Sequence, residues 1–303
     1  MVVLILALAL GLGLGLGLRH PQGGGESPPT SSPSSTSTPL SPPTSVWKPT
    51  SGLSWQIDLT DTLDIDKNDP VVTPNVDVFD IDMFLHQNNS VVESLHKLGK
   101  RVVCYFSAGS YEPYRPDSYK FDKADFGDAL DGWPDEHWLN ISSPSVRAIM
   151  ASRIEIAHKM GCDAIDPDNV DGYQNDNGLD LTSVEAIDFM TFLAKKAGGL
   201  KLAIGLKNAG DIVTDVLPLV QFAVNEQCAQ YESCDTFSAF IKANKPVFHI
   251  EYPSDAPTIS ATESRSACSA PGTSKFSTVL KTMDLTGWVE YCDGHTASTD
   301  VVS

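Results

Sequence analysis

The chain has 303 residues, of which 41% are hydrophobic and 20% charged, enough for one large domain with a substantial core. Its formal net charge of −18 argues against a nucleic-acid partner, because phosphate binding needs clustered Lys and Arg. The same acidity favours ligands that carry positive charge.

The amino terminus contains two segments that do not read as a folded domain. Residues 2–18 form an unbroken apolar run, whose length lies between a signal-peptide core and a membrane span. We therefore expect residues 1–20 to be a signal peptide or signal-anchor, with the rest secreted or held at the extracellular face of the plasma membrane. A gene model that begins too late is the alternative. Residues 21–50 are mainly Pro, Ser, Thr and Gly and are predicted to be a disordered linker before a domain at 51–303.

Six cysteines are consistent with an oxidising compartment. Cys228 and Cys234 are close together in a loop-like segment, and Cys268 and Cys292 lie in the irregular carboxyl region, so these are the two expected disulfides. Cys104 and Cys162 lie inside apolar runs and are expected to be buried thiols.

Short apolar runs recur along the folded part, and most are separated by segments with helical patterning. Residues 145–160 carry apolar side chains at helical spacing, and Thr182 begins a second helix that Gly198-Gly199 ends. Strands are predicted at 54–59, 76–84, 101–108, 162–166, 201–206, 222–225, 246–251 and 276–283. This alternation predicts an α/β fold, and about eight strands in about 250 residues predict a (β/α)8 TIM barrel. An open doubly wound sheet is the alternative, but no Gly-rich nucleotide-binding motif follows any strand.

In such a barrel the functional residues lie at the carboxyl ends of the strands. The clearest candidate is residues 162–173, where Asp166 and Asp168 are two apart and so face the same side of an extended strand. Like charges held on one face are costly to bury without a purpose. An acidic surface turn is the alternative for this segment taken alone. The other strand-end candidates are Asp58, Asp80, Asp82, Ser107, Lys207, Asn208, Asn225, Glu226, Glu251 and Tyr252.

The spacing of the potential ligands and nucleophiles along the sequence argues against zinc, calcium and serine-nucleophile sites. There is no Cys-x-x-Cys or His-x-x-x-His pattern for zinc and no Gly-x-Ser-x-Gly motif for a nucleophilic serine. The acids from Asp166 to Asp171 superficially resemble a calcium loop, but the third acid and Gly172 each come one place late. We therefore expect no metal and no cofactor. Pairs of carboxylates across a barrel mouth are the apparatus of glycoside hydrolysis. A loop is expected from Glu112 to Asn140, and the aromatic side chains in it and just before it suit stacking on sugar faces: Tyr111, Tyr114, Trp133 and Trp138.

Five motifs together resemble the glycoside hydrolases of family 114. They are CYFSAGSYE at 104–112, GWP at 132–134, DPDNVDGY at 166–173, GLKN at 205–208 and VNEQC at 224–228. The resemblance runs from about Trp55 to Tyr252, and the chain after Tyr252 matches less clearly. It implies a TIM barrel that acts as an endo-α-1,4-polygalactosaminidase, with Asp168 as nucleophile and Glu226 as general acid.

The expected partner is a galactosamine-containing polysaccharide, partly cationic, with no nucleic acid, and the expected state is a monomer. Asp80 and Asp82 are the acids most expected to bind substrate ammonium groups, unless they only bond to barrel backbone. The residues expected to bind substrate are Asp80, Asp82, Tyr105, Ser107, Glu112, Asp166, Asp171, Tyr173, Lys207, Asn208, Asn225, Glu251 and Tyr252. An exo-acting α-galactosidase and a non-catalytic carbohydrate-binding protein of the cell surface remain alternatives.

Overall fold

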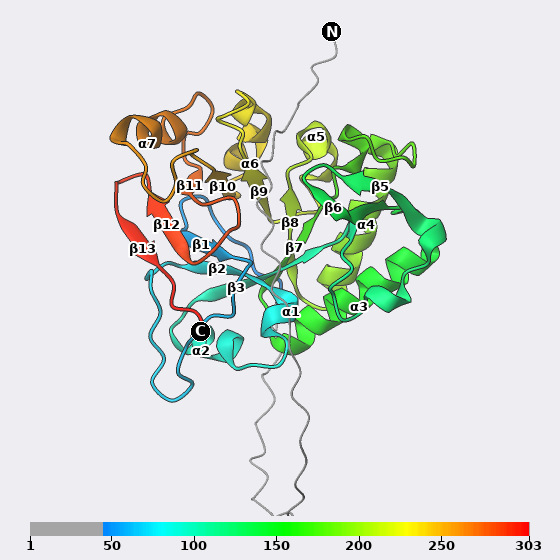
Figure 1. Ribbon diagram of the computed structural model, residues 1–303, viewed down its shortest axis with the longest axis horizontal. Coiled ribbons are helices and arrows are strands. Elements are labelled where there is room, and N and C mark those ends of the chain that lie inside the picture. The colour runs from blue at the N-terminus through cyan, green and yellow to red at the C-terminus, as the bar shows by residue number, and fades with distance from the viewer. Residues whose placement is uncertain (1–44, 303) are drawn as a thin grey trace, which may run out of the picture.

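A computed structural model describes residues 45–302, in which eight parallel strands curl into a barrel (Figure 1). Each of these strands pairs with the next along the chain. They are β1 (Trp55–Asp58), β2 (Val78–Asp82), β3 (Arg101–Ser107), β7 (Ala164–Asp168), β8 (Ala203–Lys207), β9 (Phe222–Glu226), β10 (Val247–Glu251) and β11 (Ser277–Leu280). Two antiparallel strands continue the sheet after β11, namely β12 (Trp288–Tyr291) and β13 (Thr296–Ser298). The predicted TIM-barrel class is confirmed.

The barrel closes between β1 and β11 through side chains. Within residues 45–302 the backbone ladder does not run on from β11 to β1. Instead the Trp55 indole nitrogen donates a hydrogen bond to the Ser277 carbonyl at 2.7 Å, and the Ser277 hydroxyl donates to the Leu53 carbonyl at 2.6 Å. The Lys281 ammonium group donates to the Ile57 carbonyl at 2.6 Å. These bonds satisfy backbone acceptors that a ladder would otherwise satisfy.

Helices cover the outside of the barrel (Figure 1). Gly161, with a φ of 88°, ends the helix at Pro144–Met160 on its carboxyl side, as expected for a left-handed C-cap. Thr182 and Glu185 form a capping box at the start of another, which confirms the predicted helix start. The helices are α1 (Met83–His86), α2 (Val91–Lys97), α3 (Pro144–Met160), α4 (Ser183–Gly199), α5 (Val213–Val216), α6 (Ser238–Lys242) and α7 (Ala261–Cys268).

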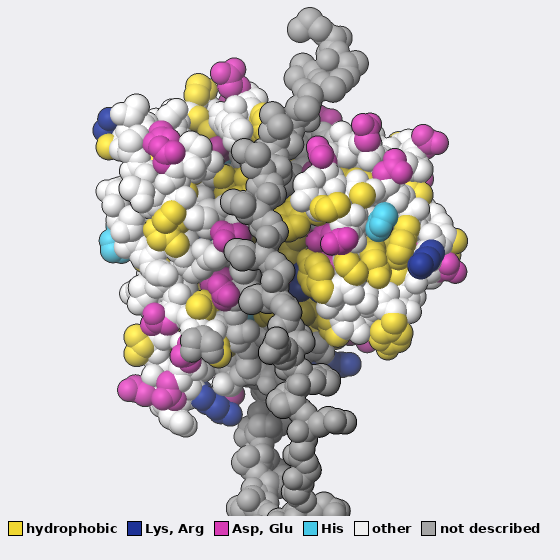
Figure 2. Space-filling model, in the orientation of Figure 1, with side chains coloured by type: hydrophobic (Ala, Val, Ile, Leu, Met, Phe, Trp, Pro, Cys, Tyr) yellow, Lys and Arg dark blue, Asp and Glu magenta, His cyan; other side chains and the backbone are white. Residues whose placement is uncertain are grey.

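The acidic composition is visible on the surface. Figure 2 shows Asp and Glu side chains spread over the face in view, with fewer Lys and Arg. None of the helices within residues 45–302 is long and apolar enough to span a membrane. The expected leader and most of the expected linker fall in residues 1–44, outside the described residues.

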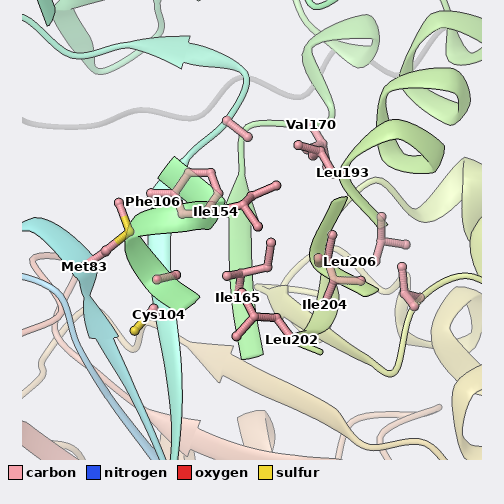
Figure 3. Packing of buried hydrophobic residues seen from close by; sticks show 14 of the residues in the cluster. Met83, Cys104, Phe106, Ile154, Ile165, Val170, Leu193, Leu202, Ile204 and Leu206 are labelled. Carbon is pink, nitrogen blue, oxygen red and sulfur yellow. The ribbon is translucent and has the colours of Figure 1, made fainter. Parts of the chain in front are cut away.

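The core has two layers, because successive side chains of a strand point to opposite faces. The outer layer lies between strands and helices, where Phe106 of β3 and Ile165 of β7 lie near Ile154 of α3 (Figure 3). Leu206 of β8 and Leu193 of α4 belong to the same layer. The inner layer fills the barrel itself and contains Trp55, Ile57, Val78, Val103, Ala164, Ala203, Phe222, Val224, Phe248, Ile250 and Val279.

The segment after β3 is a small sheet rather than the loop expected from the sequence. Its strands are β4 (Ser110–Tyr111), β5 (Phe126–Leu130) and β6 (Trp133–Leu139), in the order β4-β6-β5. Two of its four expected sugar-stacking residues are packing residues instead, since Trp138 is buried and Tyr111 packs edge-on against Phe121 and at a tilt against Phe126. Tyr114 and Trp133 are exposed.

The folded region begins before the expected boundary at Ser51. Val46 and Trp47 pack against the inner layer at the amino end of the barrel, and Pro49 is buried. The Trp47 ring lies 6.3 Å from that of Phe222. The last residues of the supposed linker therefore cover the open bottom of the barrel.

Replacing Trp47 with Ala is expected to lower the free energy of unfolding by about 2 kcal/mol, because a large apolar side chain loses its burial. For a domain of this size that corresponds to a fall in Tm of about 4–8 °C, measurable by calorimetry. Lys48→Ala, at the exposed neighbouring position, is the control and should leave Tm unchanged. Equal melting of the Trp47→Ala variant and the unaltered protein would show that the segment contributes nothing to the fold.

Three disulfides are present in the described residues. Cys228 is bonded to Cys234 and Cys268 to Cys292, as expected. The expectation of free thiols at Cys104 and Cys162 is wrong, because these two are bonded to each other. Cys104 lies on β3 and Cys162 just before β7, and the two strands are neighbours in the sheet. This bond closes a loop over a sequence separation of 58, for which chain entropy predicts a stabilisation of about 4 kcal/mol.

Candidate active site

The candidate site lies inside the carboxyl end of the barrel. Ala164 of β7 belongs to the inner layer, so the alternation of the strand also turns Asp166 and Asp168 inward. By the same argument Ala203 places Lys207 inward, and Phe222 and Val224 place Glu226 inward. The alternation of side chains therefore brings charged groups of three neighbouring strands together at one mouth, the acids of β7 and β9 and the lysine of β8.

Lys207 lies between the two predicted catalytic acids. Its Nζ is 3.1 Å from Asp168 Oδ2 and 3.3 Å from Glu226 Oε2, and its side chain is 2% exposed. The two carboxylate oxygens can thus be no further apart than the sum of these distances. Burial acts to lower the pKa of Lys207, but Asp168, Glu226 and Asp166 together raise it well above its usual value. The lysine is a permanent cation at neutral pH.

Further hydrogen bonds fix Asp168. The Tyr105 hydroxyl donates to Oδ2 at 2.9 Å, and the Asn169 backbone N–H donates to Oδ1 at 2.7 Å. Lys207 Nζ also lies 5.5 Å from the centre of the Tyr105 ring. The backbone of Gly109 approaches Asn169 so closely that a Cβ at residue 109 would lie 1.7 Å from the Asn169 carbonyl oxygen. Only glycine fits there, which explains the Ala-Gly-Ser sequence after β3.

Glu226 is held as a carboxylate. Tyr252, directly after β10, donates its hydroxyl to Oε1, and Asn208 Nδ2 donates to Oε2 at 3.1 Å. Burial acts to raise the pKa of Glu226, but Lys207 and the bonds from Tyr252 and Asn208 outweigh it and lower that pKa. Asn208 also accepts a bond from the Glu226 backbone N–H at 2.9 Å, so it anchors both ends of the residue.

Asp80 and Asp166 form a second, deeper pair in the barrel. Asp80 is 1% exposed and Asp166 is fully buried, and within residues 45–302 their four carboxylate oxygens have no hydrogen-bond partner. Burial and then Asp166 raise the pKa of Asp80 well above its usual value. Burial, with Asp168 and Glu226 adding to it against Lys207, raises the pKa of Asp166 to about 7. A buried acid without a partner avoids its charge by keeping a proton, so Asp80 is expected to be neutral here, and its binding of a substrate ammonium group stays a prediction.

Asp82 has structural partners instead of a free carboxylate. Its Oδ1 accepts bonds from the Phe84 and Leu85 backbone at 2.8 and 3.0 Å, which caps α1, and its Oδ2 lies 2.6 Å from Arg115. Arg115 also pairs with Glu112 at 2.6 Å. The expectation that Asp82 binds substrate ammonium is therefore not supported by its surroundings. Arg115 was not predicted as a partner of these acids, because nothing in the sequence of its loop distinguishes it from a surface arginine.

Three strand-end candidates face away from the mouth. Asn225 and Glu251 alternate with inner-layer residues, and so does Asp58, so all three point outward. Glu251 accepts a bond from the Ala229 backbone at 2.7 Å and lies 2.8 Å from His249 Nε2. The prediction that Asp58, Asn225 and Glu251 face the mouth of the barrel is therefore wrong.

The remaining candidates lie around the mouth. The hydroxyl of Ser107 lies 2.6 Å from that of Ser110 and accepts a bond from Asn169 at 2.9 Å. Burial, followed by the charge of Asp168, raises the pKa of Asp171 to about 7. Tyr173 is half-buried beside it, and burial together with Asp211 and Asp171 raises its pKa.

Glu136 is a further acid that sequence analysis missed. It lies on β6, where its carboxylate accepts bonds from the Tyr114 hydroxyl at 3.0 Å and the Ser110 hydroxyl at 3.2 Å. Burial and the nearby Glu112 raise its pKa to about 7. Because the small sheet was expected to be a loop, no alternation pattern marked Glu136 as inward-facing.

A group with metal-ligand chemistry lies beside β9 and β10. Ligand atoms of Cys228, Cys234 and His249 are within 4.8 Å of one another, and all three residues are buried. The two sulfurs are bonded to each other, however, and a metal needs the thiolates. The residues present therefore do not fit a metal while this disulfide is intact.

Comparison with known proteins agrees with the geometry. The sequence pattern of glycoside-hydrolase family GH114 matches residues 36–297. The crystal structure of Aspergillus fumigatus Ega3 in complex with galactosamine is 49% identical, with a TM-score of 0.77 over 82% of this chain and 99% of that one. The glycoside hydrolase domain of PelA from Pseudomonas aeruginosa shares the fold, at 13% identity and a TM-score of 0.57, over 82% of this chain and 99% of that domain. No curated protein matches the chain. The match over most of its length shows that the chain belongs to glycoside hydrolase family GH114.

Proposed function

We propose that this protein hydrolyses α-1,4-linked galactosamine polysaccharide and cuts within the polymer, using Asp168 and Glu226. The observation that carries the proposal is the pair of carboxylates bound to Lys207 at the carboxyl end of the barrel. The substrate class is supported by the galactosamine in the complex of Ega3, which is 49% identical. Deacetylated galactosamine carries an ammonium group, which suits an acidic mouth and an acidic surface (Figure 2).

The spacing of the acids favours a retaining reaction. Lys207 limits their separation to less than the roughly 6.5–9.5 Å of inverting enzymes and leaves room for the about 5–5.5 Å of retaining ones. In this mechanism an Asp168 oxygen attacks the anomeric carbon while Glu226 gives its proton to the departing oxygen. The glycosidic bond breaks and a glycosyl ester forms. Glu226 then takes a proton from water, and the hydroxide displaces Asp168.

The role of general acid requires Glu226 to be protonated when substrate is bound. A general acid must hold a proton, whereas the contacts with Lys207, Tyr252 and Asn208 lower the pKa of this residue. Substrate that enters between the two acids must therefore weaken the contact of Glu226 with Lys207 or Tyr252. Asp168 keeps the bonds from Tyr105 and Asn169, as suits a nucleophile that stays ionised.

We further propose that the enzyme works outside the cell as a monomer, with residues 2–18 as its signal or anchor. Three disulfides in the described residues support an oxidising compartment. The expected boundary of the linker moves from Ser51 to before Val46.

Digestion of a partly deacetylated α-1,4-galactosamine polymer tests the function. The expected result is a ladder of short oligomers of mixed length, because a groove that binds internal units cuts internally. Release of single sugars alone, or activity confined to small α-galactosides, would favour the exo-acting alternative. Binding of the polymer without any cleavage would favour the non-catalytic one.

A further inference from the structure

A pocket of about 330 Å³ lies at the carboxyl end of β10, and its lining includes Tyr252, which contacts Glu226. It lies between the chain that follows β9, the chain that follows β10, and one face of α7. Its volume is at the lower end of the about 300–1,000 Å³ typical of small-molecule sites. A larger cleft of about 590 Å³ involves Leu53 and Trp55 at the amino end of β1, away from the catalytic acids.

Tyr252 connects the pocket to the chemistry. Tyr252 is one of the residues that line the pocket, and its hydroxyl donates to Glu226 Oε1. A sugar unit in the pocket would therefore lie one side chain away from the proposed general acid. An enzyme that cuts internal bonds needs such sites for sugar units beside the catalytic acids.

The chemistry of the lining suits a cationic amino sugar. Two acids line the pocket, Glu251 and Glu263. Among the described residues that line it there is no Lys, Arg or His. Gln230, Ser254 and Ser266 add polar groups that can bond to sugar hydroxyls, beside the ring of Tyr252.

Of the two acids, Glu263 is the one free to meet a ligand charge. Glu251 is 4% exposed, and its Oε1 already contacts the Ala229 backbone and His249. Glu263 uses Oε2 for the capping box with Ser260, at 3.1 Å to the backbone nitrogen and 2.7 Å to the hydroxyl. Those bonds lower the pKa of Glu263, so it is charged at neutral pH.

We infer that this pocket is a subsite for one deacetylated galactosamine unit, with Glu263 facing its ammonium group. The inference rests on the proposed function and adds a residue that sets the preference for deacetylated polymer. It also gives a role to the chain after Tyr252, which the five sequence motifs do not reach.

The test measures binding, so that it does not depend on turnover. Affinity for a deacetylated galactosamine oligomer and for its N-acetylated counterpart is measured by calorimetry at low salt, on an Asp168→Asn background. Adding Glu263→Gln removes the charge but keeps the capping box, because Gln serves at that position as well as Glu. The control Glu155→Gln removes the same charge from an exposed site on α3.

Glu263→Gln is expected to raise Kd for the deacetylated oligomer about two- to fivefold and to leave Kd for the acetylated one unchanged. The difference should shrink as added salt screens an exposed pair. An equal effect on both oligomers, or no effect on either, would overturn the subsite. Failure of the proposed function would be seen separately, as an unaltered protein that binds the polymer without cutting it.

Discussion

Replacing Asp168 with Asn, or Glu226 with Gln, is expected to lower kcat/KM on the galactosamine polymer by about 10³-fold or more. Each change removes a group that acts on the reacting atoms while leaving the side-chain shape in place. Lys207 keeps one ionised partner in either variant, so both proteins should remain folded. The measurement is initial rate of reducing-end release, with circular dichroism as the check on folding.

Glu155→Gln, an exposed substitution on α3, is the matched control and should retain full activity. The two roles separate on an aryl glycoside whose leaving group needs no proton. On that substrate Glu226→Gln should keep a measurable bond-breaking step, whereas Asp168→Asn should not. The opposite pattern would exchange the two roles, and near-normal turnover by either variant on polymer would remove that residue from the mechanism.

Replacing Lys207 with Met is expected to lower kcat/KM by about 100-fold or more and to move the pH profile. Lys207 is the largest influence that lowers the pKa of Glu226 against its burial, so its loss must raise that pKa. If Glu226 is the general acid, activity persists until Glu226 loses its proton, and the alkaline limb of the profile moves to higher pH. An alkaline limb that stays in place would contradict an influence of Lys207 on the proton of the general acid.

The Lys207→Met change should also lower stability in a pH-dependent way. The folded pKa of Glu226 is lowered, so its contribution to stability is present above its unfolded pKa and is lost as pH falls through the folded one. The loss of Tm in the variant should therefore be large at pH 7 and smaller in acid. The control is Lys281→Met, a second fully buried lysine whose contacts are the Ile57 and Thr286 carbonyls and Gln56. The Lys281→Met variant should change stability without moving either limb of the pH profile of activity. A shift of either limb in this control would show that the shift in Lys207→Met is not specific to Lys207.

Much of the site could be read from the sequence because strand ends are local features. The apolar run before Asp166 and the spacing of Asp166 and Asp168 predicted one strand with two acids on one face, and the structure places both inside the barrel. Polar residues at the ends of β8 and β9 identified Lys207 and Glu226 in the same way.

Which of two adjacent residues faces the mouth was decided by the tertiary structure. Glu251 ends β10 and Tyr252 follows it directly, and both are polar, yet Tyr252 contacts Glu226 and Glu251 contacts His249 outside the barrel. A change of one residue in register exchanges the two faces of a strand, and register depends on neighbouring strands rather than on local pattern. The apolar runs were too short to settle it.

Contacts between distant segments were also beyond the sequence. The chain between β3 and β7 contains the small sheet and α3, so nothing local shows that Cys104 and Cys162 lie on neighbouring strands and can form a disulfide. Arg115 likewise becomes a partner of Asp82 only because the same insertion folds back over α1. The sequence determined which residues end the strands and hence the chemistry available at the mouth. The tertiary structure decided which of those residues meet, because barrel closure and register set every side-chain direction.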